Sequence, residues 1–258
     1  MIRLVLVGAA GRMGRAIEAA AEGAEDLLVV ARVDRPETFT ASDGVWTSDL
    51  GSVLEPGMVV VEFSSADMAA STAALCAERG AALVSGSTGL SPEQESAMRS
   101  AGERVAVLRA SNFSVGVAAL RRVLATALAA VPGSWDVEIV ERHHRLKKDA
   151  PSGTALTLAD DVLAARGAGR EALRCGREGA VGARPAGEVG VHSVRGGTWV
   201  GDHAVLLAGE GESLELRHVA QDRAAFAHGA LLAARFVAHA APGRYGIDAL
   251  LTGPATTS

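Results

Sequence analysis

Short apolar runs alternate with helix-compatible stretches through the first 113 residues, and this alternation constrains the fold more than any other feature of the sequence. Nearly continuous apolar runs of this length are typical of parallel strands that are buried on both faces. Such strands are expected at Ile2–Val7, Leu27–Val33, Met58–Phe63, Ala81–Ser85 and Val105–Arg109, with helices between them at Arg12–Glu22, Asp67–Arg79 and Pro92–Gly102. The alternation predicts an α/β fold with a Rossmann-like, doubly wound parallel sheet.

The pattern changes after about residue 114. Helices are expected at Ser114–Val131 and Ser152–Arg166, and strands at Trp135–Glu141, Glu188–Val194, Thr198–Ala208 and Ser213–Ala220. The stretch Ala168–Gly187 is rich in glycine and arginine and is interpreted as a loop. In the last strand apolar and charged residues alternate, which indicates a half-exposed antiparallel strand.

Helical periodicity returns at Asp222–His239, near the end of the chain. The order of elements therefore predicts two domains. Residues 1–114 and 222–258 are expected to form a dinucleotide-binding domain that is closed by the C-terminal helix. Residues 115–221 are expected to form a second, α+β domain with a mainly antiparallel sheet.

The charge and the hydropathy of the chain limit its partners. The net charge is −5 at pH 7, whereas nucleic-acid binding requires clustered basic charge, so no nucleic acid is expected as a partner. One basic run, Arg142–Lys148, is open to interpretation as a solvated face or as a patch for a polyanion. The apolar runs are too short for a signal-peptide core or a membrane span, and the chain is expected to be cytoplasmic, with no membrane partner.

Glycines occur at positions 8, 11 and 14, directly after the first predicted strand and at the start of the first predicted helix. In dinucleotide-binding folds one such glycine forms a tight turn, one lets backbone N–H groups approach the pyrophosphate, and one lets the helix pack closely on the strand. The helix N-terminus adds a partial positive charge. A glycine triplet alone is weak evidence, but here the strand, loop and helix that the motif requires are present.

The second predicted strand ends in Val33-Asp34-Arg35. An acidic residue at this place accepts hydrogen bonds from an adenosine ribose and favours NADH, while an adjacent arginine can hold the 2′-phosphate of NADPH. Because both residue types are present, the sequence predicts use of either NADH or NADPH. A solvated pair at a strand end is the alternative interpretation.

The segment Glu141–Ala155 places two adjacent histidines, His143 and His144, and then Lys147 at the end of a predicted strand. It continues into Pro151-Ser152-Gly153-Thr154, which has the pattern of a helix N-terminus whose backbone N–H groups and hydroxyls suit an incoming anion. Cations beside such a terminus favour a substrate carboxylate. A metal is not expected, because adjacent histidines on a strand point to opposite faces and no Asp/Glu/His set completes a site.

Glu141–Ala155 resembles the signature E-x-H-H-x-x-K-x-D-A-P-S-G-T-A of the 4-hydroxy-tetrahydrodipicolinate reductase family. Other segments resemble that family in the same order over nearly the whole chain: Gly8–Gly14 its cofactor loop, Gly86–Gly89 its G-T-T-G turn, Ser111–Val117 its N-F-S-V-G-V link, and Gly187–Gly190, Gly201–His203 and Phe226–Ala230 further motifs. The histidine–lysine signature is the most specific of these matches.

The resemblance implies roles for individual residues. His143 would be the catalytic acid/base and Lys147 the proton donor. The substrate carboxylates would be held by His144, Lys147, Ser152, Gly153 and Thr154. The cofactor would be lined by Gly8, Ala9, Ala10, Gly11, Arg12, Met13, Asp34, Arg35, Gly86, Ser87, Thr88, Ala110, Ser111, Asn112 and Phe113. The chain departs from the family at Glu62, usually Asp, at Ala66, commonly Pro, and at Ser87, usually Thr.

The implied reaction is NAD(P)H-dependent reduction of 4-hydroxy-tetrahydrodipicolinate to tetrahydrodipicolinate with loss of water, in lysine and diaminopimelate biosynthesis. The resemblance also implies a homotetramer formed through the sheet of the second domain, which would bind the dicarboxylate substrate. Two rival hypotheses remain. One is a reductase of another imine or keto dicarboxylate, similar to aspartate dehydrogenase, and the other is a non-enzymatic nucleotide-sensing protein, which would not need the histidine–lysine segment.

Overall fold

The computed structural model describes residues 1–39 and 44–251. The chain divides into two compact units, Met1–Val115 together with the segment from Arg223 onward, and Gly116–Asp222. Residues 252–258, which the sequence assigns to the dinucleotide-binding domain, lie outside the described residues. The expected fold class, a Rossmann-like parallel sheet with a second α+β part, is confirmed.

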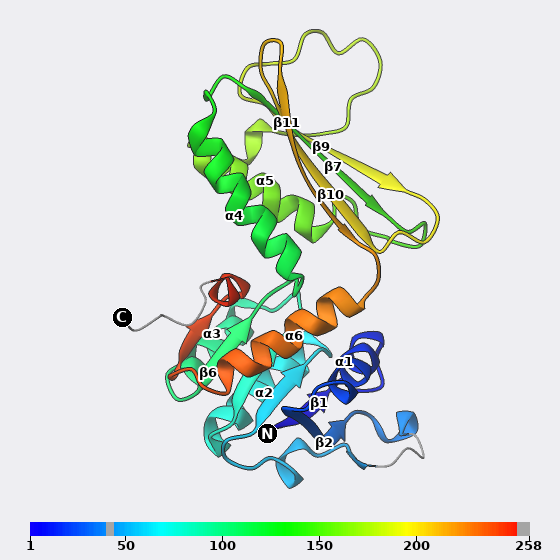
Figure 1. Ribbon diagram of the computed structural model, residues 1–258, viewed down its shortest axis with the longest axis vertical. Coiled ribbons are helices and arrows are strands. Elements are labelled where there is room, and N and C mark those ends of the chain that lie inside the picture. Colours follow the sequence, from blue (N-terminus) through cyan, green and yellow to red (C-terminus); the bar gives the residue numbers. More distant parts are fainter. Residues whose placement is uncertain (40–43, 252–258) are drawn as a thin grey trace. The chain divides into compact units, whose positions relative to one another are not determined.

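The sheet of the first unit is parallel. Among the described residues its seven strands lie in the order β12-β6-β5-β4-β1-β2-β3 (Figure 1). The bounds are β1 Ile2–Val7, β2 Leu27–Val33, β3 Val45–Thr47, β4 Val59–Glu62, β5 Ala82–Ser85, β6 Ala106–Arg109 and β12 Gly243–Tyr245. Because β1 pairs with β2 on one side and with β4 on the other, the strand order reverses at β1. Open α/β sheets bind ligands beside such a reversal, at the carboxyl ends of the strands.

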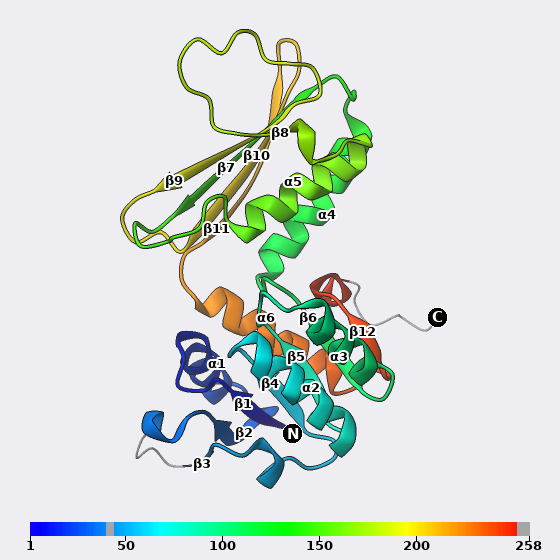
Figure 2. The same cartoon turned by 180° about the vertical axis from the view of Figure 1, so that it is seen from behind.

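Helices cover both faces of this sheet. Their bounds are α1 Arg12–Glu22, α2 Ala66–Arg79, α3 Pro92–Gly102 and α6 Ala224–Val237. Helix α1 packs against α6, and α2 packs against α3 on the opposite face (Figures 1 and 2). This double cover explains why the middle of β4 is fully buried. Helix α3 begins with a capping box, in which Ser91 and Gln94 each accept a hydrogen bond from the other's backbone N–H.

The second unit holds a mixed sheet with two helices. Among the described residues its strands lie in the order β11-β10-β7-β9-β8, with bounds β7 Asp136–His143, β8 Leu173–Cys175, β9 Val189–Arg195, β10 Gly201–Ala208 and β11 Ser213–Ala220. Strand β10 pairs antiparallel with β7 and β11, while β9 pairs parallel with β7 and β8. The antiparallel character expected from the sequence therefore holds for β11-β10-β7 but not for the β9-β8 edge.

Helices α4, Val115–Ala130, and α5, Gly153–Arg166, pack on one face of this sheet (Figure 1). Their contact forms an aliphatic core that includes Leu124, Ile139, Leu158, Val162, Val191, Val205 and Leu207. Along β7 the side chains alternate between buried and half-buried positions. The buried positions are Val137 and Ile139 in the first half of the strand, and Glu141 and His143 at its end. The same strand thus supplies core residues first and titratable groups last.

In the part of the chain that the structure describes, three short strands were not expected from the sequence. Strand β8 and the 3₁₀ turn Arg170–Ala172 lie in the stretch interpreted as loop, so that interpretation was wrong at these residues. Strands β3 and β12 each have three residues and extend the parallel sheet at its two edges. Such short edge strands depend on pairing with a neighbour that is distant in sequence, and they leave no periodic pattern of their own.

Candidate functional site

The glycine loop joins β1 to α1 and requires its glycines for space. Gly8 has φ of +80°, and a Cβ on it would lie 2.4 Å from the carbonyl oxygen of Phe63. A Cβ on Gly14 would lie 2.4 Å from the carbonyl oxygen of Gly8. Helix α1 begins at the loop, with Gly11 as its cap, and its first turn contains no acidic residue. The loop therefore presents backbone N–H groups and a helix N-terminus to its surroundings, which suits a phosphate group.

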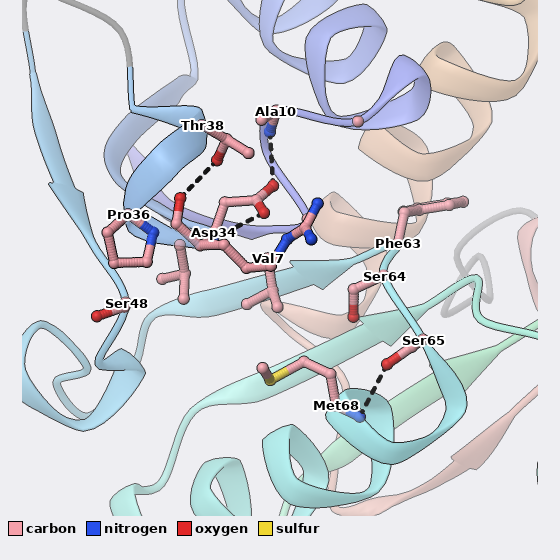
Figure 3. Close-up of a pocket in the computed structure, with 14 residues that line it drawn as sticks. Val7, Ala10, Asp34, Pro36, Thr38, Ser48, Phe63, Ser64, Ser65 and Met68 are labelled. Carbon is pink, nitrogen blue, oxygen red and sulfur yellow. Dashed lines mark hydrogen bonds between the residues drawn. The ribbon is translucent and has the colours of Figure 1, made fainter.

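A pocket of about 550 Å³ lies against this loop (Figure 3). It is lined by Val7, Gly8, Ala10, Gly11, Val33, Asp34, Arg35, Pro36, Thr38, Ser48, Phe63, Ser64, Ser65 and Met68. These residues come from the carboxyl ends of β1, β2 and β4 and from the segments that follow them, with Ser48 added from directly after the end of β3. The position is the one at which a doubly wound sheet binds a dinucleotide.

Asp34 joins the glycine loop to the end of β2. One carboxylate oxygen accepts a hydrogen bond from the backbone N–H of Ala10 at 2.9 Å, and the other accepts one from the N–H of Arg35 at 2.8 Å (Figure 3). The guanidinium of Arg35 is exposed, and its Nη1 lies 3.5 Å from a carboxylate oxygen of Glu37. Asp34 and Arg35, which the sequence predicts to contact the adenosine ribose or its 2′-phosphate, therefore both line the pocket. Asp34 is held by hydrogen bonds, whereas Arg35 extends into solvent.

Glu62 is a fully buried carboxylate at the end of β4, held by hydroxyl and backbone donors. Its Oε1 accepts hydrogen bonds from Ser64 N at 2.7 Å, Ser64 Oγ at 2.6 Å and Ser87 Oγ at 2.6 Å. Its Oε2 accepts one from Ser85 Oγ at 2.7 Å. Glu62 thus connects the pocket wall at Ser64 to Ser87, which the resemblance assigns to the cofactor but which does not line the pocket itself.

Two phenylalanines extend the same wall. The rings of Phe63 and Phe113 lie with their centroids 5.1 Å apart and their planes tilted by 60°. A Cβ on Gly86 would lie 2.1 Å from the Phe63 ring, so only glycine fits there. The structure therefore brings Gly86, Ser87 and Phe113 next to pocket-lining residues. It does not place Ala9, Arg12, Met13, Thr88 or the segment Ala110–Asn112 among the residues that line this pocket.

In the second unit Glu141 and His143 form a pair at the end of β7. His143 Nδ1 lies 2.5 Å from Glu141 Oε2. Burial raises the pKa of Glu141, but the hydrogen bonds from His143 and Arg195 outweigh burial and hold the pKa below its ordinary value of 4.5. Glu141 is therefore a carboxylate at neutral pH. It fixes the imidazole of His143 through Nδ1 and leaves Nε2 to meet a ligand.

The same carboxylate reaches the N-terminus of α5. Glu141 Oε1 accepts a hydrogen bond from Ser152 N at 3.1 Å, and Ser152 Oγ caps the helix by accepting one from Ala155 N at 3.2 Å. The first turn of α5 contains no acidic residue. A Cβ on Gly153 would meet nothing within 4 Å, so the backbone there is open. A helix N-terminus of this kind attracts a carboxylate.

Lys147 lies in the turn after β7 and is engaged by a neighbour. Its Nζ donates to both carboxylate oxygens of Asp149, at 2.9 and 2.8 Å. The backbone N–H of His144 donates to the carbonyl of Trp199 at 2.8 Å. Within the described residues the buried Nδ1 of His144 has no hydrogen-bond partner. The structure thus joins His143 to Ser152 directly through Glu141, whereas it holds Lys147 in an ion pair.

Arg195 and His203 complete what we call the Glu141 cluster, which consists of Glu141, His143, Ser152, Arg195 and His203. Arg195 donates to both oxygens of Glu141, at 2.8 and 2.7 Å, and to the carbonyl of Asp149 at 2.8 Å. His203 Nε2 lies 3.0 Å from Ser152 Oγ. The ring of His203 packs edge-on against that of His143, with the centroids 5.1 Å apart.

Sequence reasoning missed three members of this cluster. Glu141 opens the signature but received no role, and Arg195 was not considered. His203 is named in the sequence only as the end of the Gly201–His203 motif and has no role there, whereas its side chain is buried and contacts Ser152. The partners lie 54 positions apart for Arg195 and Glu141, and 51 for His203 and Ser152, so no local spacing could reveal them. The available signal was the Gly201-Asp202-His203 match to the family.

In residues 1–39 and 44–251 no group of three or more His, Cys, Asp or Glu side chains is arranged to hold a metal ion. Across the same described ranges, none of the helices combines the length and apolar character that crossing a membrane requires.

Comparison with known proteins extends over both units. A family model described as dihydrodipicolinate reductase, N-terminus, matches residues 2–113, and one described as dihydrodipicolinate reductase, C-terminus, matches residues 116–251. The chain is 44% identical over 257 residues to the protein named 4-hydroxy-tetrahydrodipicolinate reductase from Myxococcus xanthus (strain DK1622), covering 94% of this chain and 95% of that one. The protein of the same name from Anaeromyxobacter sp. (strain Fw109-5) is 42% identical over 258 residues, covering 95% and 96%.

A solved structure is similar over the same extent. It is that of dipicolinate-bound dihydrodipicolinate reductase from Paenisporosarcina sp. TG-14, with a TM-score of 0.81 and 28% sequence identity. The match covers 96% of this chain and 99% of the other.

Proposed function

This chain belongs to the dihydrodipicolinate reductase family, and on that premise we propose that the pocket beside its glycine loop binds the reduced cofactor, while its Glu141 cluster and Lys147 bind and protonate the substrate. The chain is an NAD(P)H-dependent oxidoreductase that reduces 4-hydroxy-tetrahydrodipicolinate to tetrahydrodipicolinate, in lysine and diaminopimelate biosynthesis. The reaction takes up one hydride and one proton and releases one water. The alternative as a reductase of another keto or imine dicarboxylate is not favoured.

The first unit fits a dinucleotide. The glycine loop can turn tightly into α1, since Cβ atoms at Gly8 and Gly14 would clash with the backbone oxygens of Phe63 and Gly8. The N-terminus of α1 would hold the phosphates, and Asp34 would accept hydrogen bonds from a ribose. Arg35 extends into solvent, where it can pair with a 2′-phosphate. When bound, the cofactor supplies the hydride; the remaining chemistry belongs to side chains of the chain.

The second unit supplies charge for the substrate. One carboxylate would bind the N-terminus of α5 at Gly153 and Thr154, because the helix dipole favours an anion there. Lys147 would bind a carboxylate by exchanging its present partner, Asp149, for the substrate. His144, whose Nδ1 has no partner in the described residues, would contribute a further hydrogen bond.

Protonation follows from the direction of electron flow. Loss of the 4-hydroxyl as water gives a ring with conjugated C=C and C=N bonds. Hydride addition at carbon 4 places electron density on this system, and a nearby acid must protonate it. Lys147 would donate that proton, and His143 would supply or relay one through Nε2, because Glu141 occupies Nδ1. The observation that supports this assignment most is the single carboxylate of Glu141, which joins His143 to the N-terminus of α5.

The test is a coupled assay in which the substrate is generated in situ and the absorbance of NADH or NADPH is followed. We expect His143→Ala and Lys147→Ala each to lose on the order of 10²-fold in kcat. Lys148→Ala is the matched control, because Lys148 is the exposed neighbour of Lys147 and has no assigned role. Near-normal turnover in both His143→Ala and Lys147→Ala would exclude this mechanism. Cofactor binding by the wild-type chain without any turnover would favour the nucleotide-sensing alternative.

We also propose a homotetramer, in the cytoplasm. Helices α4 and α5 lie on one face of the second sheet, and on the other face Val194 and Val219 are 38% and 50% exposed. Apolar side chains on an uncovered sheet face suit an interface between copies. Light scattering should then give a mass of four chains of 26.3 kDa each. A monomer mass at the concentration of the assay would contradict the proposal.

A further inference from the structure

His203 lies on β10, beside the end of β7, and its imidazole is 3% exposed. Nε2 lies 3.0 Å from Ser152 Oγ, while the buried Nδ1 has no hydrogen-bond partner within the described residues. Burial, and secondly the nearby His143, lowers the pKa of His203 to about 4, so the ring is neutral at pH 7. One ring nitrogen therefore has a proton and the other does not.

The surroundings select which nitrogen has the proton. If Ser152 donated its hydroxyl proton to Nε2, the proton on Nδ1 would be a buried donor without an acceptor. If Nε2–H donates to Ser152, only a lone pair on Nδ1 is left without a partner, and buried orphan donors are the rarer of the two in proteins. The second arrangement is therefore favoured. His203 is then the donor and Ser152 Oγ the acceptor.

This arrangement leaves the serine hydroxyl proton available. Oγ of a serine has two lone pairs and one proton. The N–H of Ala155 uses one lone pair, and His203 uses the other. The hydroxyl proton of Ser152 is then left to donate a hydrogen bond to an anion at the N-terminus of α5. His203 thus sets the orientation of Ser152 without touching the anion.

The other side of the ring meets His143. The two imidazoles are 5.1 Å apart between centroids with their planes at 73°, an edge-to-face contact. Glu141 fixes one nitrogen of His143, but a single hydrogen bond leaves the ring free to rotate about it. The contact with His203 removes that freedom. Gly201, from the same strand as His203, leaves the space beside His143 Nε2 open, since a Cβ there would lie only 3.3 Å from it.

We propose that His203 is a positioning residue of the substrate site, which orients the hydroxyl of Ser152 through Nε2 and the imidazole of His143 through ring packing. The inference rests on the proposed function, because it assigns His203 to a site that binds a dicarboxylate and protonates it. A positioning role can be told apart from a purely structural one. The contact with Ser152 serves substrate binding and the contact with His143 serves proton transfer, so the two effects can be removed separately.

Two variants separate the contacts. His203→Phe keeps a ring against His143 but removes the donor to Ser152. His203→Gln keeps an amide N–H near the position of Nε2 but removes the ring. The matched controls are His218→Phe and His218→Gln, because His218 pairs with His203 across β10 and β11. For each full-length variant, calorimetric titration with dipicolinate gives Kd, the coupled assay gives kcat, and thermal unfolding gives the midpoint.

His203→Phe should raise the Kd for dipicolinate about tenfold and change kcat by less than about threefold, since one hydrogen bond at an anion site is lost. His203→Gln should lower kcat by on the order of tenfold or more and leave Kd within about threefold, since a misoriented acid slows proton transfer. The His218 variants should resemble wild type in both.

Equal changes of Kd and kcat in the two His203 variants, or no change in either, would overturn the proposal. If one variant does not fold, the other is a sufficient test. An unchanged Kd in His203→Phe contradicts the inference by itself, and so does an unchanged kcat in His203→Gln. A wild-type chain that neither binds dipicolinate nor reduces the substrate would instead contradict the proposed function.

Discussion

Arg195 donates two hydrogen bonds to the buried carboxylate of Glu141, through Nη1 at 2.8 Å and Nη2 at 2.7 Å. The pair joins the ends of β9 and β7, which are parallel neighbours in the second sheet. Arginine suits this position because its planar guanidinium can serve both oxygens at once. Glu141 is thereby held as an anion, which is the form that accepts hydrogen bonds from Nδ1 of His143 and from the N–H of Ser152.

Replacing Arg195 by alanine should therefore damage the site as well as the fold. The buried charge of Glu141 would lose its cation, and the loss of one partner of a buried pair costs about 3–5 kcal/mol. We expect the pKa of Glu141 to rise and kcat to fall by on the order of tenfold or more, with the fall larger at acid pH. The pH profile of kcat measures this. Arg217→Ala is the control, because Arg217 makes a similar double contact with Asp202 elsewhere on the sheet. If kcat fell equally in Arg195→Ala and Arg217→Ala, Arg195 would act only on the stability of the fold.

Glu62 should act on the cofactor rather than on the substrate. Glu62→Gln keeps the shape but removes the charge that holds Ser64 and Ser87, and hydrogen bonds to an ionised group are about twice as strong as neutral ones. We expect KM for NADH to rise roughly threefold to tenfold, with a smaller change in kcat, because the pocket wall loosens. Initial rates at several NADH concentrations measure it, with Glu93→Gln on the exposed start of α3 as control. An unchanged KM would show that this wall does not touch the cofactor.

The sequence predicted the fold class and the cofactor loop because both depend on local patterns. A buried parallel strand is a continuous apolar run, and Gly8, Gly11 and Gly14 follow it directly. The same reasoning could not assign Arg195 or His203, because their contacts join strands that are distant in the sequence. It also could not show that Lys147 pairs with Asp149, since both residues lie in a turn without periodicity. The family resemblance indicated which residues form the site, and the structure showed which side chains they contact.

Asp34 should favour NADH, and Arg35 should favour NADPH. Arg35→Ala removes an exposed cation, so KM for NADPH should rise about tenfold while KM for NADH changes little, as expected for one lost phosphate contact. Asp34→Asn keeps the size of the side chain but removes the charge that a ribose hydroxyl would meet, so KM for NADH should rise several-fold. Rates with each cofactor measure both effects. Arg15→Ala, an exposed arginine on α1, is the control. A rise of equal size for both cofactors in Arg35→Ala would contradict the assignment.

His203 should make the folded protein less stable in mild acid. Its pKa is lowered from 6.5 to about 4, first by burial and then by His143 and His218, against the opposite influence of Glu141 and Asp202. Between these pH values the unfolded chain binds a proton that the folded protein does not, so the free energy of unfolding falls as pH falls from about 6.5 to about 4. The shift corresponds to about 3 kcal/mol at most. Urea unfolding at about pH 7 and about pH 5 measures the loss, which His203→Gln should reduce and which His228→Gln, at an exposed position of α6, should leave unchanged. If His203→Gln lost as much stability as wild type over this interval, the acid sensitivity would have to arise from other groups, and the neutral state of His203 would no longer be supported.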